Sequence, residues 1–177
     1  KICFIGLKKE NEWVLGIIEK DKEERILVSS EYAKVHPTWS TDDKTIAYSE
    51  IKFLDFEPEL NNTYTEETQL IELKIIDLTS SIIKTISNKN ILYFNYNWTP
   101  DGRSIITFEK HDRMIGKLEL TDIKTDKKKE VLLLPYPRKN INIKHIDTDN
   151  IIFLSPTPSL PIKYESIAIY DNYGIFR

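Results

Sequence analysis

The chain has 177 residues, of which 40% are apolar and 30% are charged, a composition typical of one globular domain rather than of a disordered chain. The net charge of -3 argues against a general nucleic-acid-binding protein, which usually has a basic face. No window approaches the roughly 18 uninterrupted apolar residues of a membrane span. Cys3 is the only cysteine, which excludes an internal disulfide and a cysteine-rich metal site.

Segments rich in Ile, Val, Leu, Tyr and Phe follow one another along the whole chain, separated by clusters of Asn, Asp, Lys and Pro. In chain order the clearest are ICFIGL, WVLGIIE, RILVSS, TIAYSE, LIELKIIDL, SIIKTIS, SIITFE, GKLELTDI, EVLLL, NIIFLS and SIAIYD. No stretch of about twelve residues has clean helical periodicity. We therefore predict an all-β fold. The opening KICFIG has neither an initiator Met nor a leader, which predicts a processed protein or an excised piece.

Three landmarks recur along these segments and indicate a repeat. A residue before a turn is Trp39, Trp98 or, more weakly, Ile146. The first apolar residue of the next strand is Ile2, Ile46, Ile105 or Ile151. An acid closes the strand after that: Glu19, Asp77, Asp122 or Asp171. Apart from an insertion of about 14 residues in the second unit, the period is roughly 45 residues, as expected of a four-stranded propeller blade.

Each unit is therefore expected to contain strands a, b, c and d, with a Trp at the end of strand a. In the a–b turn TPDGR, Pro100 presets its backbone angle, Asp101 bonds the nearby backbone, and Gly102 tolerates a positive φ. In STDDK, Asp42 and Asp43 are the expected turn formers.

The segments HPTWSTDDKTIAYS and NYNWTPDGRSIITF resemble the TolB-type (WD-repeat-like) β-propeller repeat, whose usual form is Pro-x-Trp-Ser-Pro-Asp-Gly-x-x-Ile-Ala-Phe. The motif is present in two of the four units. The fourth unit lacks the Trp, and the first lacks strand a. The resemblance implies an all-β propeller of four-stranded antiparallel blades, with about four repeats present, and hence a partial propeller. It also favours an extracytoplasmic location, in the periplasm or at the cell surface.

We predict one domain over residues 1–177, with approximate units 1–40, 41–99, 100–147 and 148–177. An open arc of blades exposes two sheet edges and two apolar flanks. We therefore expect the isolated chain to self-associate through its open blade flanks.

In a propeller, the b–c and d–a loops share one rim. The b–c segments here are long (51–69, 109–117 and 155–165), and the d–a segments 29–37, 87–95 and 134–140 add aromatic residues. Irregular loops on a rigid scaffold usually carry binding. The predicted binding residues are Tyr32, His36, Phe56, Glu57, Glu59, Tyr64, Tyr93, His111, Arg113, Tyr136 and Arg138.

Several of these features have a simpler interpretation. The acidic and aromatic insertion is either a lip for a basic partner or a solvated excursion. The segment SPTPSLP is a polyproline-type ligand or a stiffened loop. Trp39 and Trp98 stack on a carbohydrate or pack between blades. The basic run 124–130 is most simply a solvated hairpin.

Metal sites are not predicted. His36 and His145 are expected at or in strand a and His111 in a rim loop; they match no metal-binding spacing and are more simply surface or channel residues. The acids Asp101, Asp147 and Asp149 suggest calcium-binding loops, but the capping of turns is the simpler explanation for them. No cofactor motif is present.

The chain contains no G-x-S-x-G elbow, phosphate-binding glycine loop or H-E-x-x-H motif, so no catalytic residue is predicted. We predict a non-enzymatic scaffold that binds a protein or peptide partner. Two alternatives stay open. One is the propeller portion of a prolyl-oligopeptidase-like serine hydrolase, whose catalytic domain lies outside this chain. The other is a carbohydrate-active propeller such as a lyase.

Overall fold

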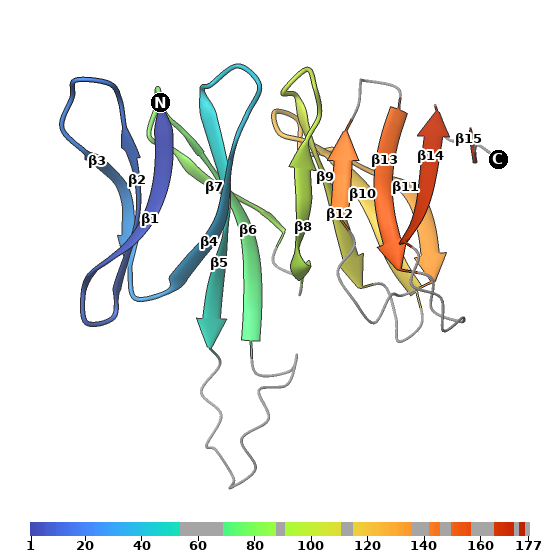
Figure 1. Ribbon diagram of the computed structural model, residues 1–177, viewed down its shortest axis with the longest axis horizontal. Coiled ribbons are helices and arrows are strands. Elements are labelled where there is room, and N and C mark those ends of the chain that lie inside the picture. Colours follow the sequence, from blue (N-terminus) through green and yellow to red (C-terminus); the bar gives the residue numbers. More distant parts are fainter. Residues whose placement is uncertain are drawn as a thin grey trace, which may run out of the picture. The chain divides into compact units, whose positions relative to one another are not determined.

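The computed structural model describes residues 1–53, 69–87, 91–110, 115–135, 142–145, 150–156, 165–171 and 174–175. Within these ranges the chain forms strands and turns and no helix, which confirms the predicted all-β class (Figure 1). The chain divides into two compact units, 1–90 and 91–177.

The first unit contains two antiparallel sheets in which neighbours in sequence are neighbours in space. The first sheet has the order β1-β2-β3, with β1 (Ile2–Lys9), β2 (Glu12–Ile18) and β3 (Arg25–Ser30). The second has the order β4-β5-β6-β7, with β4 (Ala33–Trp39), β5 (Thr45–Phe53), β6 (Gln69–Asp77) and β7 (Ile83–Ser87).

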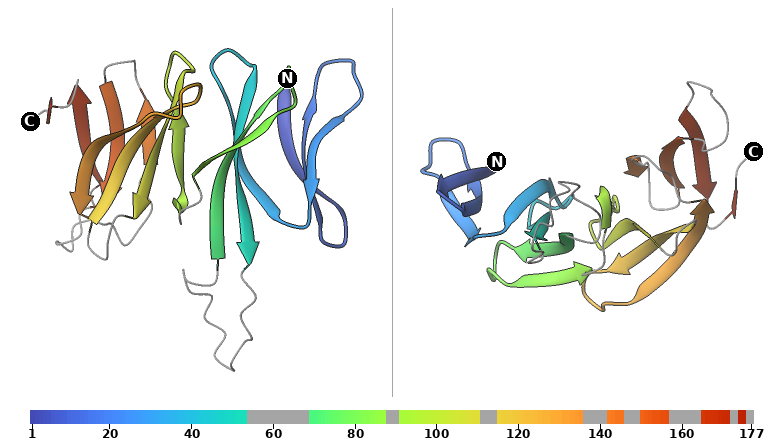
Figure 2. Two further views of the ribbon diagram at one scale, coloured as in Figure 1. Left: turned by 180° about the vertical axis from the view of Figure 1, so that it is seen from behind. Right: turned by 90° about the horizontal axis from the view of Figure 1, so that it is seen from below.

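The second unit repeats this arrangement with two four-stranded sheets, both visible in Figure 2. One sheet consists of β8 (Ile91–Trp98), β9 (Ser104–Lys110), β10 (Ile115–Asp122) and β11 (Lys128–Pro135). The other consists of β12 (Asn142–His145), β13 (Asn150–Pro156), β14 (Glu165–Asp171) and β15 (Gly174–Ile175).

The sequence landmarks coincide with the strand ends. Trp39 ends β4 and Trp98 ends β8, and each pairs across the ladder with the expected residue, Ile46 or Ile105. The acids Asp77, Asp122 and Asp171 end β6, β10 and β14, and Glu19 directly follows β2. The three four-stranded sheets begin at strand a, whereas the predicted units begin near strand b. That division of the chain stays a prediction.

The two a–b turns that the structure describes have the same hydrogen-bond pattern, although their sequences differ. Thr99 Oγ1 donates to Asp101 Oδ1 over 2.6 Å, and the same carboxylate accepts from the Arg103 N–H at 3.0 Å. In the other turn, Asp42 Oδ1 accepts from Ser40 Oγ at 2.7 Å and from the Lys44 N–H at 3.1 Å. A left-handed residue follows each carboxylate: Gly102 at φ 67° and Asp43 at φ 57°. The turn roles predicted for Asp42, Asp43, Asp101 and Gly102 are confirmed.

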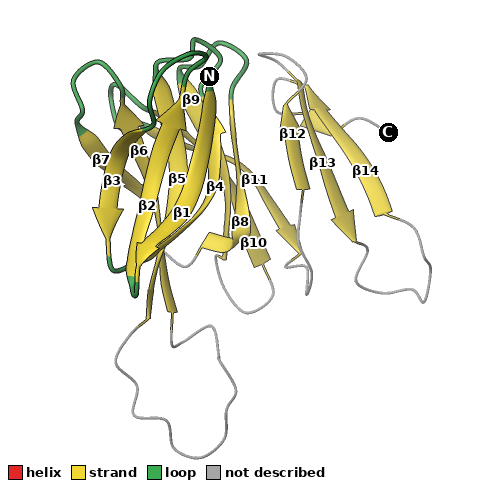
Figure 3. Cartoon of the chain, turned by 60° about the vertical axis from the view of Figure 1, so that its left-hand side comes forward, coloured by secondary structure: helices red, strands yellow, loops and turns green. Residues whose placement is uncertain are grey.

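Two of the acids that close strand c, Asp77 and Asp122, cap the c–d turns that follow them. Asp77 Oδ1 accepts from the N–H groups of Thr79 and Ser80, both at 2.8 Å. Asp122 Oδ1 accepts from the N–H groups of Lys124 at 3.0 Å and Thr125 at 2.7 Å. Backbone bonds from Leu78 to Lys44 (2.9 Å) and from Ile123 to Arg103 (3.0 Å) join each c–d turn to the a–b turn of its own sheet. In the first unit these turns gather at one end of the sheets (Figure 3).

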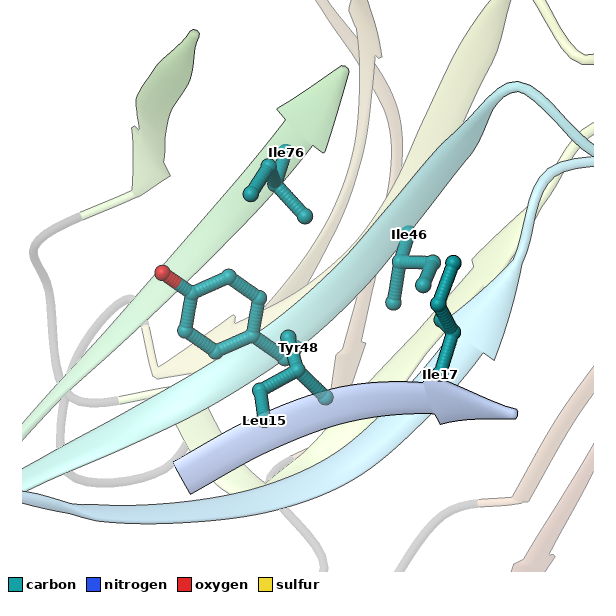
Figure 4. Close-up of a cluster of buried hydrophobic side chains, with 5 residues drawn as sticks. All are labelled: Leu15, Ile17, Ile46, Tyr48 and Ile76. Carbon is teal, nitrogen blue, oxygen red and sulfur yellow. The ribbon is translucent and has the colours of Figure 1, made fainter. Parts of the chain in front are cut away.

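The core of the first unit lies between its two sheets. Leu15 and Ile17 of β2 face Ile46 and Tyr48 of β5 and Ile76 of β6, and all five are at most 3% exposed (Figure 4). Trp39 packs against this cluster, which favours the blade-packing interpretation of this residue over carbohydrate stacking. The Tyr48 hydroxyl is buried and has no hydrogen-bond partner among the residues that the structure describes. Burial, followed by the charges of Glu50 and Glu72, raises the pKa of Tyr48 far above its ordinary value.

We predict that Tyr48→Phe raises the free energy of unfolding by about 1 kcal/mol, because a buried donor without a partner carries its full desolvation cost. Tyr48→Ala should instead lower it by about 3 to 5 kcal/mol, because it removes the ring and leaves a cavity. Chemical denaturation of the three proteins measures both changes. A loss of stability in Tyr48→Phe would show that the hydroxyl does have a partner in solution.

The turn-capping acids predict the behaviour of the protein in acid. Hydrogen bonds from the Ser80 and Thr125 N–H groups lower the pKa of Asp77 and Asp122, respectively. A folded pKa below the unfolded one gives stability that is present above the unfolded value of about 3.9 and is lost as pH falls through the folded value. We expect the denaturant concentration at the unfolding midpoint to decrease as the pH is lowered below about 4. The decrease should be smaller in an Asp77→Asn/Asp122→Asn double variant. Plots of this midpoint against pH that run parallel for the two proteins would contradict the prediction.

Candidate binding rim

Two of the predicted binding residues, Tyr32 and His36, have side chains that the structure describes. Tyr93 lies in β8, but its side chain is outside the described part. The other predicted residues lie outside the described residues: Phe56, Glu57, Glu59, Tyr64, His111, Arg113, Tyr136 and Arg138.

Strands occupy most of the predicted d–a segments 29–37 and 87–95, so the connections there are shorter than those segments. β3 continues to Ser30 and β4 starts at Ala33, so this connection is only Glu31 and Tyr32. His36 and Tyr93 therefore belong to strands. Polar residues made segment 29–37 resemble a loop, but β4 tolerates Lys34 because Glu50 stands directly opposite it on β5. His36 is exposed at φ 51°, within the register shift between Val35 and Thr38.

A cluster of charged residues lies next to Tyr32, at the b–c end of the second sheet. We call it the rim cluster; its members are Tyr32, Lys34, Glu50, Lys52, Glu72 and Lys74. Lys34 pairs in register with Glu50, and Glu50 with Glu72, while Lys74 and Lys52 stand two residues further along β6 and β5. Because side chains alternate along a strand, these groups share the sheet face that also carries Ile46 and Tyr48.

Lysines and glutamates alternate along the rim cluster. Glu50 bridges Lys34, at 3.6 Å, and Lys74. Glu72 bridges Lys74, at 3.1 Å, and Lys52, at 2.9 Å. Three ammonium groups thus share two carboxylates. The surplus positive charge reaches solvent most readily at Lys52, whose side chain is 27% exposed.

Lys34 is the buried end of the cluster. It is 1% exposed, and its Nζ donates to Ser30 Oγ at 2.5 Å and to the Tyr32 carbonyl at 3.0 Å. Burial lowers the pKa of Lys34, against the opposing charge of Glu50 and its hydrogen bond. Ser30 belongs to the first sheet, so Lys34 joins both sheets to the β3–β4 connection.

Tyr32 is held at the surface end. Its N–H donates to Ser30 Oγ at 3.2 Å, its carbonyl accepts from Lys34, and Lys52 Nζ lies 5.2 Å from the centre of its ring. A hydrogen bond with Glu31 raises the pKa of Tyr32. The result is an aromatic ring and an ammonium group in fixed positions at the rim.

Sequence reasoning found Tyr32 but missed the five charged members of the cluster. A signal was present: SEIKF and IELK each place a Glu two residues before a Lys, so opposite charges share one face of each strand. What the pattern could not supply is the register that sets Glu50 beside Glu72 and brings Lys74 between them.

The sheet of β8 to β11 has a smaller charged cluster of its own. Glu119 pairs with Lys117 and, over 2.8 Å, with Lys128, and its neighbour across the ladder, Thr107, is buried. Glu119 is itself buried; burial raises its pKa, but hydrogen bonds from the two lysines bring the net shift of the pKa below the ordinary value. Lys128 of the basic run thus has a structural contact rather than only a solvated position.

Among the residues that the structure describes, no group of three or more His, Cys, Asp and Glu side chains could hold a metal ion. Over the same residues, no helix is long and apolar enough to cross a membrane.

The fold is that of TolB-like propellers. TolB from Acinetobacter baumannii is 20% identical over 93% of this chain and 37% of that chain, with a TM-score of 0.65. An oligogalacturonate lyase in complex with manganese is 13% identical over 94% and 42%, with a TM-score of 0.61. The β-propeller domain of the Trilobed protease from Pyrococcus furiosus is 15% identical over 99% and 57%, with a TM-score of 0.57. No family model and no curated protein matches the chain.

These similarities confirm the predicted TolB-like β-propeller fold, with about three to four blades of a partial propeller. The chain spans well under two thirds of the length of each of the three proteins. At this level of identity, the likeness concerns the fold alone, since unrelated activities share such scaffolds.

We predict that Glu50→Gln lowers the free energy of unfolding by about 3 kcal/mol, because it leaves the buried Lys34 ammonium without its counter-charge. A Lys34→Met/Glu50→Gln double variant should recover much of this loss, since the uncompensated charge is gone. Glu24→Gln, at an exposed position, is the matched control and should change little. Equal stability of the Glu50 and Glu24 variants would show that the ion pairs contribute nothing.

Proposed function

We propose that the chain is a non-enzymatic propeller scaffold that binds a protein or peptide partner through the rim formed by its b–c and d–a connections. One observation carries the proposal: Tyr32 and Lys52 are held at the rim by a buried network rather than by solvent-exposed contacts alone.

Such fixed side chains favour binding for two physical reasons. A Tyr ring and a nearby cation are the kinds of group that dominate the energy of protein interfaces. Groups that are already ordered also lose less conformational entropy when a partner arrives. The connection between β5 and β6, residues 54–68, starts two residues after Lys52, and its sequence contains five acids and no basic residue.

The opposite end of the described sheets has fewer side chains available to contact a partner. The a–b and c–d turns there are short, and their polar side chains are occupied by hydrogen bonds within the turns. The b–c end is therefore the better candidate for recognition. The location outside the cytoplasm, like the absence of enzymatic activity, stays a prediction.

The two alternative functions also stay predictions. Solved structures with this fold include a protease propeller domain and a lyase in complex with manganese, which is the reason to keep both. A G-x-S-x-G segment in a longer natural chain would favour the hydrolase. A metal bound by the purified protein would favour the lyase.

A random-peptide phage library panned against the immobilised chain tests the proposed function. We expect enriched peptides whose affinity falls about tenfold or more in Tyr32→Ala and Lys52→Gln, because each variant removes one half of the surface contact. Lys22→Gln, an exposed lysine at the opposite end, is the control. Failure to enrich any peptide, or enriched peptides that bind all variants equally, would contradict a binding site at this rim.

A further inference from the structure

Trp13 lies on the face of the first sheet that is turned towards the second sheet. It alternates along β2 with Leu15 and Ile17, which belong to the core between the two sheets and are at most 3% exposed. β2 is paired on both sides, with β1 and with β3, and it lies beside β4 of the second sheet. The position of Trp13 is therefore set by strands that the first unit itself contains.

The β2–β3 ladder places Trp13 next to the rim cluster. Trp13 pairs with Ser30, and residues directly opposite each other in an antiparallel pair have Cβ atoms about 5 Å apart. The Oγ atom of Ser30 accepts hydrogen bonds from Lys34 Nζ at 2.5 Å and from the Tyr32 N–H at 3.2 Å. Trp13 is thus the direct neighbour of the serine that helps to hold Tyr32 at the rim.

The repeat does not require a tryptophan at this position. The acid at the end of strand c gives the alignment between sheets: the residue six positions before it is Trp13 in the first sheet, Ile71 in the second and Gly116 in the sheet of β8 to β11. The tryptophans that do recur, Trp39 and Trp98, end strand a. Trp13 is therefore a feature of one blade rather than of the fold.

Trp13 is also only half-buried, unlike Leu15 and Ile17 on the same face. Trp39 packs against the core cluster between the sheets, whereas Trp13 is not among the described side chains that pack against it. The second sheet changes along β5 from the apolar Tyr48 to the charged Glu50, so the apolar core stops before it reaches the rim. A partly exposed tryptophan of this kind has the side chain most enriched among residues that dominate binding energy.

Net charge does not select the partner at this site. The surplus positive charge of the rim cluster is offset by Glu31, whose carboxylate is hydrogen-bonded with Tyr32. What the site offers in addition is apolar surface from the indole of Trp13 and the ring of Tyr32. Apolar contact with these two groups is therefore the main source of affinity for a partner.

We propose that Trp13 is a specificity-determining residue of the rim site and that the partner segment places a large apolar side chain, such as Phe, Leu or Trp, against its indole. This inference rests on the proposed function, and it extends the binding site from the second sheet onto the first. A small or polar side chain at the same place in the partner would leave the indole in contact with water and would bind more weakly.

The test compares random-peptide phage pools that are selected on the immobilised parent chain and on Trp13→Thr, a substitution that keeps a residue suited to a strand. We expect the parent pool to share a large apolar residue at one position, and the Trp13→Thr pool to lack that preference. The affinity of an enriched peptide, measured by fluorescence polarisation, should fall about tenfold in Trp13→Thr and should largely recover in Trp13→Phe. Ile82→Ala is the matched control, since Ile82 is apolar and 65% exposed but lies in a c–d turn.

Quenching of tryptophan fluorescence by acrylamide tests contact with Trp13 in the unaltered protein. An enriched peptide that itself lacks tryptophan should reduce the quenching in the parent chain, because it covers the indole, and should not reduce it in Trp13→Phe. Chemical denaturation of each variant shows whether a loss of binding comes from a loss of folding.

The possible outcomes separate this inference from the proposed function. Peptides that lose affinity in Tyr32→Ala but bind Trp13→Thr as they bind the parent would overturn the role of Trp13 and leave the rim site standing. A parent pool without a shared apolar position, or quenching that the peptide does not change, would overturn it as well. If no peptide is enriched on the parent chain, both the inference and the proposed function fail.

Discussion

The register of β5 against its two neighbours is the constraint on which the first unit depends. Side chains alternate along a strand, so the register that turns Ile46 and Tyr48 towards the first sheet also turns Glu50 and Lys52 to the same face. The apolar half of that face forms the core, and the charged half forms the rim cluster. A shift by one residue would turn Ser49 and Ile51 towards the first sheet instead and would separate Glu50 from Lys34. Core and candidate site therefore share one structural cause.

The two ends of the strands use polar groups differently. At the a–b and c–d end, carboxylates such as Asp77 and Asp101 accept hydrogen bonds from residues two or three positions away, and the turns are locally complete. At the other end, the backbone of Tyr32 bonds Ser30 and Lys34, each two positions away, but Lys34 is in turn paired with Glu50 of the neighbouring strand. The ion pairs between strands therefore tie this short connection to the sheet, which local hydrogen bonds alone would not do.

Repetition makes individual positions comparable within one chain. The left-handed position of the a–b turn is Gly102 in one sheet and Asp43 in another, and the same bond pattern surrounds both. The isoleucine of strand b is covered in two sheets and exposed in the first. Positions with the same role in each of these sheets are required by the fold, whereas positions that differ between sheets are not. The likeness to TolB and to enzyme propellers reflects the required positions, because it concerns the fold alone.

By itself, the sequence determined the strands, the repeat and the turns, since these depend on side-chain alternation, period and short-range hydrogen bonding. Trp39, Asp77 and Gly102 were all placed correctly on such grounds. Only the tertiary structure decided that Lys34 belongs to a strand and that Lys52 lies over Tyr32. Those positions depend on which residues of distant strands stand opposite one another. Strand register is a property of the assembled sheet, and no local stretch of sequence contains it.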